Sequence, residues 1–245
     1  MKIIIDLQGA QSTGSRNRGI GRYSLSITKA MLQNKRNHEI ILVLSNLFQE
    51  TIDLIKDEFE DYIDEKNIYV WNAPNNVSYI DTKNDTSRKN AEYIRETFLA
   101  SLQPDIIFVT SLFEGLIDDA VTSINLMKYN IPTAVILYDL IPLINSSPYL
   151  DNSDVKRWYE AKIEHLKKAN LLLSISESSK KEALDYLHFS SDNVINISTA
   201  ADSQFKKIDF SKEKSDEILS RYRLTKSFLM YTGGIDHRKN IEGLI

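Results

Sequence analysis

The sequence predicts an α/β protein built on a doubly wound, Rossmann-like parallel sheet. Three observations predict it. Short apolar runs recur along the chain, these runs are rich in β-branched residues, and segments with helical spacing separate them. The runs are continuous rather than alternating, which is typical of strands covered by helices on both faces. Strand and helix in repeated alternation give such a sheet with right-handed crossovers.

The expected strands cover residues 3–5, 40–44, 68–71, 106–109, 134–137, 171–173 and 194–197, and an eighth covers 228–231. Residues 86–102 and 155–168 have the apolar spacing of amphipathic helices. A capping-box pattern at 179–182 predicts the start of another helix. The side chains expected on the buried faces of the first two helices are Ala91, Ile94, Phe98, Leu102, Trp158, Ala161, Ile163 and Leu166.

Composition excludes several classes of protein. The chain has 245 residues, of which 42% are hydrophobic and 26% charged, so it can bury a sizeable core and is not a wholly disordered chain. A net charge of −4 argues against general nucleic-acid binding. The absence of cysteine removes disulfides, Cys-ligated zinc and thiol catalysis, and fits a reducing compartment. The four histidines have no metal-ligand spacing, so we expect no structural metal.

No targeting or membrane-spanning segment is recognisable. The longest uncharged stretches fall well short of the roughly 18 apolar residues of a transmembrane helix. We therefore expect a cytoplasmic protein, with peripheral attachment to the inner face of the membrane left open.

A charged stretch over residues 205–226 indicates a connecting loop and a solvated helix. It separates an expected domain over residues 1–224 from residues 225–245, which begin a second α/β unit with a strand, a glycine turn and a helix that opens near Arg238. So short a piece cannot form a domain, and we expect the chain to be a fragment of a longer protein.

The glycines mark candidate binding loops, because most of them follow the first or the last expected strand and precede a helix. The carboxyl ends of strands are where open α/β sheets bind ligands, and glycine lets backbone amides approach an anion. The first loop also carries arginines, which suit bidentate contact with phosphate, so we expect it to bind a phosphate or sugar phosphate. The alternative interpretation is a flexible basic loop with turn glycines. The residues concerned are Gly9, Gly14, Arg16, Arg18, Gly19, Gly21 and Arg22 in the first loop, and Gly233, Gly234 and Gly243 in the last.

Three further segments of the chain carry candidate residues. Tyr138 and Asp139 end the fifth strand, where a phenol and a carboxylate can orient a hydroxyl-bearing ligand, although packing and turn capping explain them equally well. Ser176 follows the sixth strand as a helix cap or a ligand contact. Arg238 and Lys239 lie at an expected helix start, where cations interact unfavourably with the helix dipole. This cost suggests that an anion binds there, and the alternative interpretation is a frayed, solvated helix end.

Five motifs, taken in chain order, resemble family 4 glycosyltransferases with the GT-B fold, in particular mannosyltransferase-like enzymes of bacterial O-antigen and capsule assembly. These motifs lie at residues 6–9, 18–23, 138–142, 176–179 and 231–240. The resemblance implies an enzyme with two facing Rossmann-like halves, of which the N-terminal half holds the acceptor and the C-terminal half the nucleotide-sugar donor. It implies a metal-independent reaction with retention at the anomeric carbon.

The resemblance also implies residue roles. Gly19 and Gly21 would lie near the donor diphosphate, Lys239 would bind phosphate with Arg238 beside it, and Asp139 would match the aspartate of a frequent His-Asp pair on the acceptor side. There are departures from the family pattern. Many relatives have histidine in place of Tyr138 and a phosphate-binding arginine in place of Gly234, and the family's donor-side glutamate pair would lie beyond residue 245.

The sequence thus predicts a fragment of a retaining glycosyltransferase that transfers a hexose, with mannose favoured, from a nucleotide diphosphate sugar to a saccharide or lipid-linked saccharide. No cofactor is expected beyond the donor, and the fragment alone should be nearly inactive. The expected catalytic residues are Tyr138 and Asp139, and the expected substrate-binding residues are Arg18, Gly19, Gly21, Arg22, Ser176, Arg238 and Lys239.

Two alternatives stay open. One is a non-catalytic module that binds a saccharide or a sugar nucleotide. The other is a nucleotide-dependent oxidoreductase. The segment 19–24 reads G-x-G-x-x-S, so the third glycine of the dinucleotide fingerprint is missing, and no ribose-binding acid ends the second strand. These departures argue against the oxidoreductase.

Overall fold

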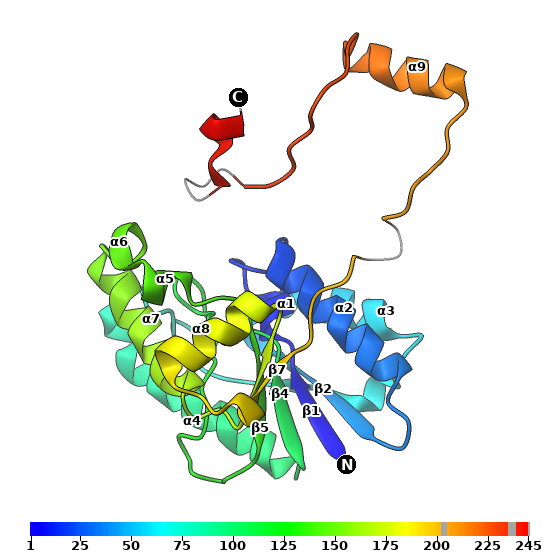
Figure 1. Ribbon diagram of the computed structural model, residues 1–245. Helices are drawn as coiled ribbons and strands as arrows, with labels where there is room; N and C mark the ends of the chain where they lie inside the picture. The colour runs from blue at the N-terminus through cyan, green and yellow to red at the C-terminus, as the bar shows by residue number, and fades with distance from the viewer. Residues whose placement is uncertain (202–204, 235–238, 245) are drawn as a thin grey trace. The chain divides into compact units, whose positions relative to one another are not determined.

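The computed structural model describes residues 1–201, 205–234 and 239–244 (Figure 1). The chain divides into two compact units, Met1–Ala200 and Ala201–Ile245. The first unit contains the sheet, and the described residues of the second form a helix, a 3-10 turn and irregular chain.

The first unit is built on a seven-stranded parallel sheet with the order β3-β2-β1-β4-β5-β6-β7. All of the strands expected within it form, so the predicted Rossmann-like α/β fold is confirmed. The strand order reverses between β1 and β4, which makes this pair the topological switch point of the sheet. The strands are β1 Lys2–Asp6, β2 Glu39–Ser45, β3 Ile68–Trp71, β4 Ile106–Val109, β5 Thr133–Leu137, β6 Leu171–Ser174 and β7 Val194–Asn196.

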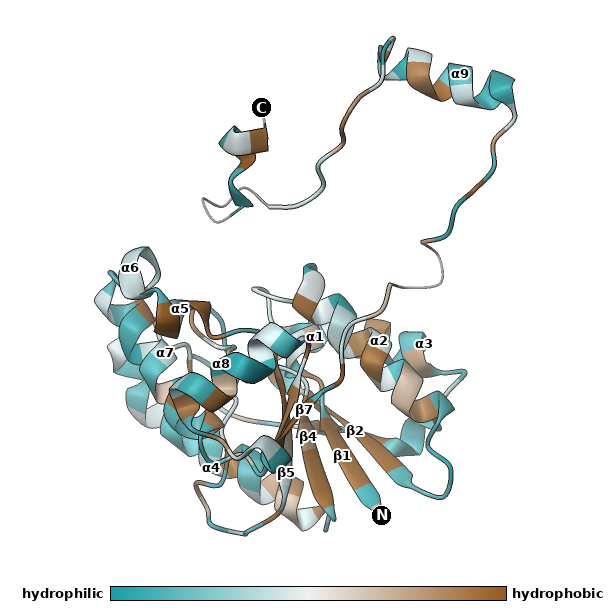
Figure 2. Cartoon of the chain, in the orientation of Figure 1, coloured by the Kyte–Doolittle hydropathy of each residue, from teal (hydrophilic) through white to brown (hydrophobic). Residues whose placement is uncertain are grey.

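Helices cover both faces of the sheet, and the strands between them are apolar (Figure 2). Successive strand residues alternate between two cores. Ile4 packs in the core beneath α4, α7 and α8, and Ile5 packs in the core beneath α2 and α3. The helices of this unit are α1 Gln8–Gln11, α2 Gly19–Gln33, α3 Gln49–Phe59, α4 Asp85–Ser101, α5 Ile141–Ile144, α6 Ser146–Tyr149, α7 Ser153–Leu166 and α8 Glu177–Leu187. Short 3-10 turns lie at Asn46–Phe48, Glu65–Asn67, Thr82–Asn84 and Ser191–Asn193.

The buried face of α4 is more polar than its apolar spacing predicts. Ile94 was expected inside, and its side chain is 41% exposed. The buried face instead includes Arg88, Glu92 and Arg95 beside apolar residues. Periodicity assigns charged residues to solvent, but an arginine can be buried when it is paired with an acid. Arg95 has such a partner in Asp6.

Helix α7 also buries polar groups that periodicity does not predict. The ammonium of Lys162 donates to the carbonyl and the hydroxyl of Thr122, at 2.8 and 2.7 Å, and burial lowers the pKa of Lys162 to about 8. Nδ1 of His165 accepts the N–H of Ile124 at 3.2 Å, and burial lowers the pKa of His165 to about 3. Among the apolar residues expected on this face, Ile163 and Leu166 are buried, whereas Trp158 and Ala161 are half-buried.

A buried ion pair closes the carboxyl end of β1. Asp6 and Arg95 have side chains that are 1% exposed, and Nε of Arg95 donates to Oδ2 of Asp6 at 2.8 Å. Nη1 of Arg95 donates to the carbonyl of Ser123 at 3.0 Å, and the N–H of Gln8 donates to Oδ1 of Asp6 at 3.1 Å. The Gln8 side chain exchanges two hydrogen bonds with the backbone of Val121. The end of β1, helix α4 and the chain that follows β4 are thereby joined.

In the second unit, α9 (Lys212–Arg221) has no buried residue, as expected for a solvated helix, and Ile241–Leu244 form a 3-10 turn. The strand expected at residues 228–231 does not form. A strand needs a hydrogen-bonded neighbour, and here Leu229 and Met230 are 86% and 77% exposed. The residues at the expected helix start, 235–238, lie outside the described part of the chain.

Among the residues that the structure describes, no helix is long and apolar enough to cross a membrane.

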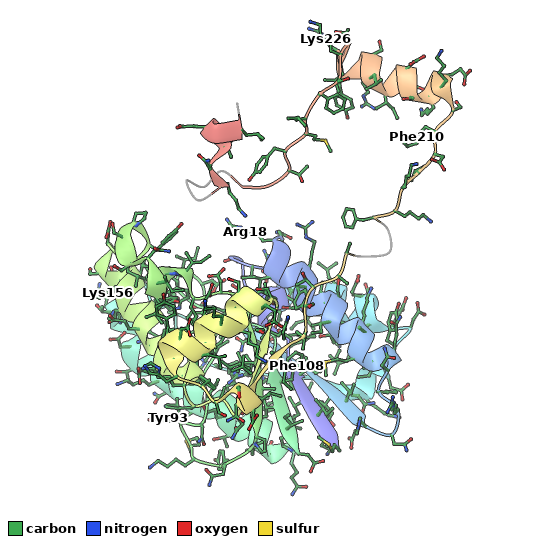
Figure 3. The ribbon with its side chains drawn as sticks, in the orientation of Figure 1. Arg18, Tyr93, Phe108, Lys156, Phe210 and Lys226 are labelled. Atoms are coloured by element: carbon green, nitrogen blue, oxygen red, sulfur yellow. The ribbon has the colours of Figure 1, made fainter. Side chains whose placement is uncertain are left out.

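Replacing Asp6 with alanine should lower the free energy of unfolding by about 3–5 kcal/mol, because it leaves the Arg95 guanidinium buried without its counter-charge. Lys156, labelled in Figure 3, forms an exposed pair with Glu160, so K156A should cost less than about 1 kcal/mol. Urea unfolding followed by circular dichroism measures both values. Equal losses in the two variants would contradict the structural role given to the buried pair.

Candidate functional site

The candidate site lies at the switch point of the sheet, where two loops leave neighbouring strands. The first loop (residues 7–18) follows β1, and the β4 loop (residues 110–124) follows β4. The two strand ends are tied together, because the hydroxyl of Thr110 donates to the carbonyl of Asp6 at 2.8 Å. Ligands of open α/β sheets bind in the crevice outside such strand ends.

Two acids of the β4 loop hold the first loop. Oε1 of Glu114 accepts the hydroxyl of Ser15 at 2.6 Å. Oδ2 of Asp118 accepts the hydroxyl of Ser12 at 2.8 Å and the N–H of Thr13 at 2.7 Å. Burial raises the pKa of the Glu114 carboxyl. Neither acid can be recognised from the sequence, because nothing local shows that it contacts a loop about a hundred residues away.

The first loop leads into the open N-terminal end of α2. The N-cap residue Arg18 has an extended backbone and gives no side-chain cap, and no acid occupies the first turn. The first amides of any helix lack intrahelical partners. Here the N–H of Gly21 donates back to the carbonyl of Ser15 at 3.1 Å, and the amides of Gly19 and Ile20 have no capping side chain.

The two glycines of this helix start have different reasons to be glycine. A Cβ on Gly21 would lie 2.5 Å from the backbone Cα and O of Arg16, so the packing of the first loop on α2 requires glycine there. A Cβ on Gly19 would meet nothing within 4 Å. Packing therefore does not require Gly19, and its lack of a side chain leaves the helix end accessible.

The arginines predicted for this loop are divided between two roles. Nη1 of Arg16 lies 2.5 Å from Oε1 of Glu50 in α3, and this pairing lowers the pKa of Glu50. Arg18, labelled in Figure 3 at the start of α2, and Arg22 are exposed. Neither forms an ion pair with another residue in the described part of the chain. Within the described residues, Arg18 and Arg22 thus lie beside the open helix end without an acidic partner.

Tyr138 is half-buried beside this site. Its hydroxyl donates to the carbonyl of Thr110 at 3.1 Å, and its ring packs edge-on against Tyr23 of α2 with centroids 5.9 Å apart. Burial raises the pKa of Tyr138 above its ordinary value, so the phenol is neutral. Asp139 is exposed, and its Oδ1 accepts the N–H of Ile141 at 3.2 Å, which is the turn cap that the sequence offered as an alternative.

The second helix start at this edge, that of α8, is closed. The hydroxyl oxygen of Ser176 accepts the N–H of Ser179 at 3.1 Å, so Ser176 is the N-cap and α8 begins at Glu177. The capping box predicted at 179–182 is wrong, because the helix has already begun there. Glu177 adds an acid to the first turn and accepts a hydrogen bond from Asn196 at 2.6 Å. The positive end of α8 is therefore satisfied within the protein, unlike that of α2.

The remaining predicted positions belong to the second unit. Lys239 is exposed, and Arg238 lies outside the described residues. In the part of the chain that the structure describes, no three His, Cys, Asp or Glu side chains are grouped as metal ligands would be.

The fold and the open helix start define a Rossmann-like domain with a candidate anion site at its switch point. Over its whole length the chain is 32% identical to a serotype-specific mannosyltransferase WbdA of Escherichia coli, of which it covers 29%. A second Escherichia coli protein with that description is 29% identical over 89% of this chain, and the match covers 27% of that protein's length. The chain thus spans less than a third of the length of these relatives. The expected resemblance to mannosyltransferases of bacterial surface polysaccharide is confirmed.

Two other comparisons add less. No family model matches the chain. The solved structure of Arabidopsis thaliana UGT89C1 is similar with a TM-score of 0.50 at 8% identity, and the match covers 90% of this chain and 54% of that one. This likeness concerns the fold alone.

The glycine pair makes a test of the site geometry. Gly21→Ala should lower the free energy of unfolding by about 1–3 kcal/mol, because the new Cβ overlaps the first loop. Gly19→Ala should be neutral or stabilise the protein by up to about 1 kcal/mol, because it replaces a helical glycine in open space. Chemical unfolding measures both. A loss in G19A as large as that in G21A would show that packing, not access, requires Gly19.

Proposed function

We propose that the chain is the acceptor-side part of a retaining glycosyltransferase that transfers a hexose, mannose in the first place, from a nucleotide diphosphate sugar to a saccharide or lipid-linked saccharide. The observation that carries the proposal is the 32% identity, along the whole chain, to a mannosyltransferase. Residues 1–224 would form the acceptor-side domain, and residues 225–245 would begin a nucleotide-sugar-binding domain. The enzyme would work in the cytoplasm, with peripheral membrane contact where the acceptor is lipid-linked.

In this proposal the open start of α2 receives the phosphates of the donor. The leaving nucleotide diphosphate gains negative charge in the transition state, so groups that stabilise this charge accelerate transfer. The uncapped amides of Gly19 and Ile20, the helix dipole and the exposed guanidinium groups of Arg18 and Arg22 all favour an anion at this place. Lys239 and Arg238 would contribute further cations from the second domain.

The acceptor sugar would lie against the end of β5. Asp139 presents an exposed carboxylate, which can accept a hydrogen bond from a sugar hydroxyl and orient it. Tyr138 is neutral, and its hydroxyl already donates to the backbone of Thr110, so this side chain would shape the site and hold the Asp139 backbone in place. Ser176 would contribute mainly as the cap that fixes the start of α8.

The Arg18 side chain provides the first test. In the full-length protein, Arg18→Gln should lower kcat/KM for a nucleotide diphosphate mannose by about ten- to a hundredfold, because it removes a cation from the leaving group. The matched control is R36Q, which removes an exposed arginine between α2 and β2, at the amino edge of the sheet. Transfer of labelled mannose to a saccharide acceptor gives the rates. Equal activity in R18Q and the wild type would refute the assigned role.

The acceptor side has its own test. Asp139→Asn keeps an oxygen for the turn hydrogen bond to Ile141 but removes the charge, so kcat/KM for the acceptor should fall about tenfold or more while the KM for the donor stays unchanged. Initial rates at varied acceptor concentration measure this. A wild-type protein that binds a sugar nucleotide but transfers no sugar would instead support the non-catalytic binding module.

A further inference from the structure

Two neighbouring acids in the β4 loop hold different segments of the protein. Oδ2 of Asp118 accepts the hydroxyl of Ser12 and both the N–H and the hydroxyl of Thr13, at 2.7 to 2.8 Å. Oδ1 of Asp119 accepts the N–H groups of Val77 and Ser78, at 2.7 and 3.2 Å. Of these two aspartates, Asp118 contacts the first loop and Asp119 contacts residues 77–78, although the two carry the same charge and are adjacent in the chain.

The β4 loop that carries Asp118 is itself fixed. Its carbonyls at Gly115 and Leu116 accept the N–H groups of Tyr79 and Ile80, at 3.0 and 2.8 Å. Gly115 has a φ of +84°, and a Cβ there would overlap the carbonyl oxygen of Ala120, so the turn is tight and requires glycine. The backbone on the N-terminal side of Asp118 is therefore fixed by contacts within the protein.

A continuous path of hydrogen bonds leads from Asp118 to the helix start. Asp118 accepts the hydroxyl of Ser12. The backbone carbonyl of Ser12 in turn accepts the N–H groups of Ser15 and Arg16, at 3.1 and 2.8 Å. The carbonyl of Ser15 then accepts the N–H groups of Arg18 and Gly21, at 2.8 and 3.1 Å. Displacement of the Ser12 turn would therefore move the residues that begin α2.

The charge of Asp118 makes its role unusual. A carboxylate near a phosphate site weakens phosphate binding by repulsion. Here one oxygen of that carboxylate is used by three donors of the first loop, at Ser12 and Thr13. The negative charge of Asp118 should weaken phosphate binding, whereas its hydrogen bonds to the first loop should strengthen it. Because the two effects have opposite signs, an experiment can separate them.

We infer that Asp118 is a positioning residue for the anion site: it fixes the first loop so that the amides that begin α2 and the Arg18 guanidinium face a phosphate or diphosphate group, without touching that group itself. The inference rests on the proposed function, because it names what orders the phosphate site of that proposal. It adds a residue from the β4 loop to a site otherwise formed by the first loop and α2.

The test compares D118A with D119A, each in the whole chain, with inorganic pyrophosphate as the probe. In D118A, amide hydrogen exchange over residues 12–18 should become about tenfold faster or more, and the Kd for pyrophosphate should rise about tenfold. In D119A the same negative charge is lost, but exchange over residues 12–18 should stay as in the wild type, and the Kd should be unchanged or lower. Isothermal calorimetry gives the two Kd values.

Asp118→Asn serves where D118A does not fold, because it keeps the size of the side chain and one acceptor oxygen, and its exchange and Kd should lie between those of D118A and the wild type. The inference is overturned if D118A and D118N bind pyrophosphate as the wild type does, or if D119A weakens binding as much as D118A. A wild-type chain that does not bind pyrophosphate overturns the proposed phosphate site instead, which is a separate outcome.

Discussion

The buried ion pair between Asp6 and Arg95 is the interaction on which the carboxyl edge of the sheet depends. Taking two charges out of water is costly, and the cost is offset only when the remaining donors and acceptors are used. Here Gln8 and the carbonyl of Ser123 use them. Since these partners come from β1, α1, α4 and the β4 loop, one set of hydrogen bonds determines where both loops of the candidate site leave the sheet. A site that requires precise backbone placement is thus built on polar contacts that are almost wholly buried.

The two helix starts at this edge show how the same element can be closed or open to a ligand. Helix α8 has a serine cap and an acid in its first turn, so its dipole is satisfied by the protein. Helix α2 has neither, and it has cations and an accessible Gly19 in their place. Leaving a helix end uncapped costs stability, on the order of 1 kcal/mol. This cost is understandable when a bound anion supplies the missing partner, which in the proposed function is a phosphate of the sugar nucleotide.

The strands could be placed from the sequence because each is a continuous apolar run that is buried on both sides, and this pattern is local. The inner face of α4 could not be predicted from the sequence, because the burial of Arg95 depends on its ion pair with Asp6, which lies 89 residues away. The start of α8 was placed too late, because several serines compete for the cap and geometry selects Ser176. The same distinction applies to the site. Glycines and arginines of the first loop are visible in the sequence, whereas Asp118 acts across 106 residues and becomes visible only in three dimensions.

The proposed function and the role inferred for Asp118 both require that an anion binds at the open start of α2. Titration of the isotopically labelled chain with pyrophosphate, followed by the amide resonances in two-dimensional NMR spectra, tests it most directly. We expect the amide resonances of Gly19 and Ile20 to shift most, because their N–H groups gain a charged acceptor. Unchanged resonances for these two amides, or largest shifts at Glu177 and Ser178 at the capped start of α8, would show that no anion binds at α2.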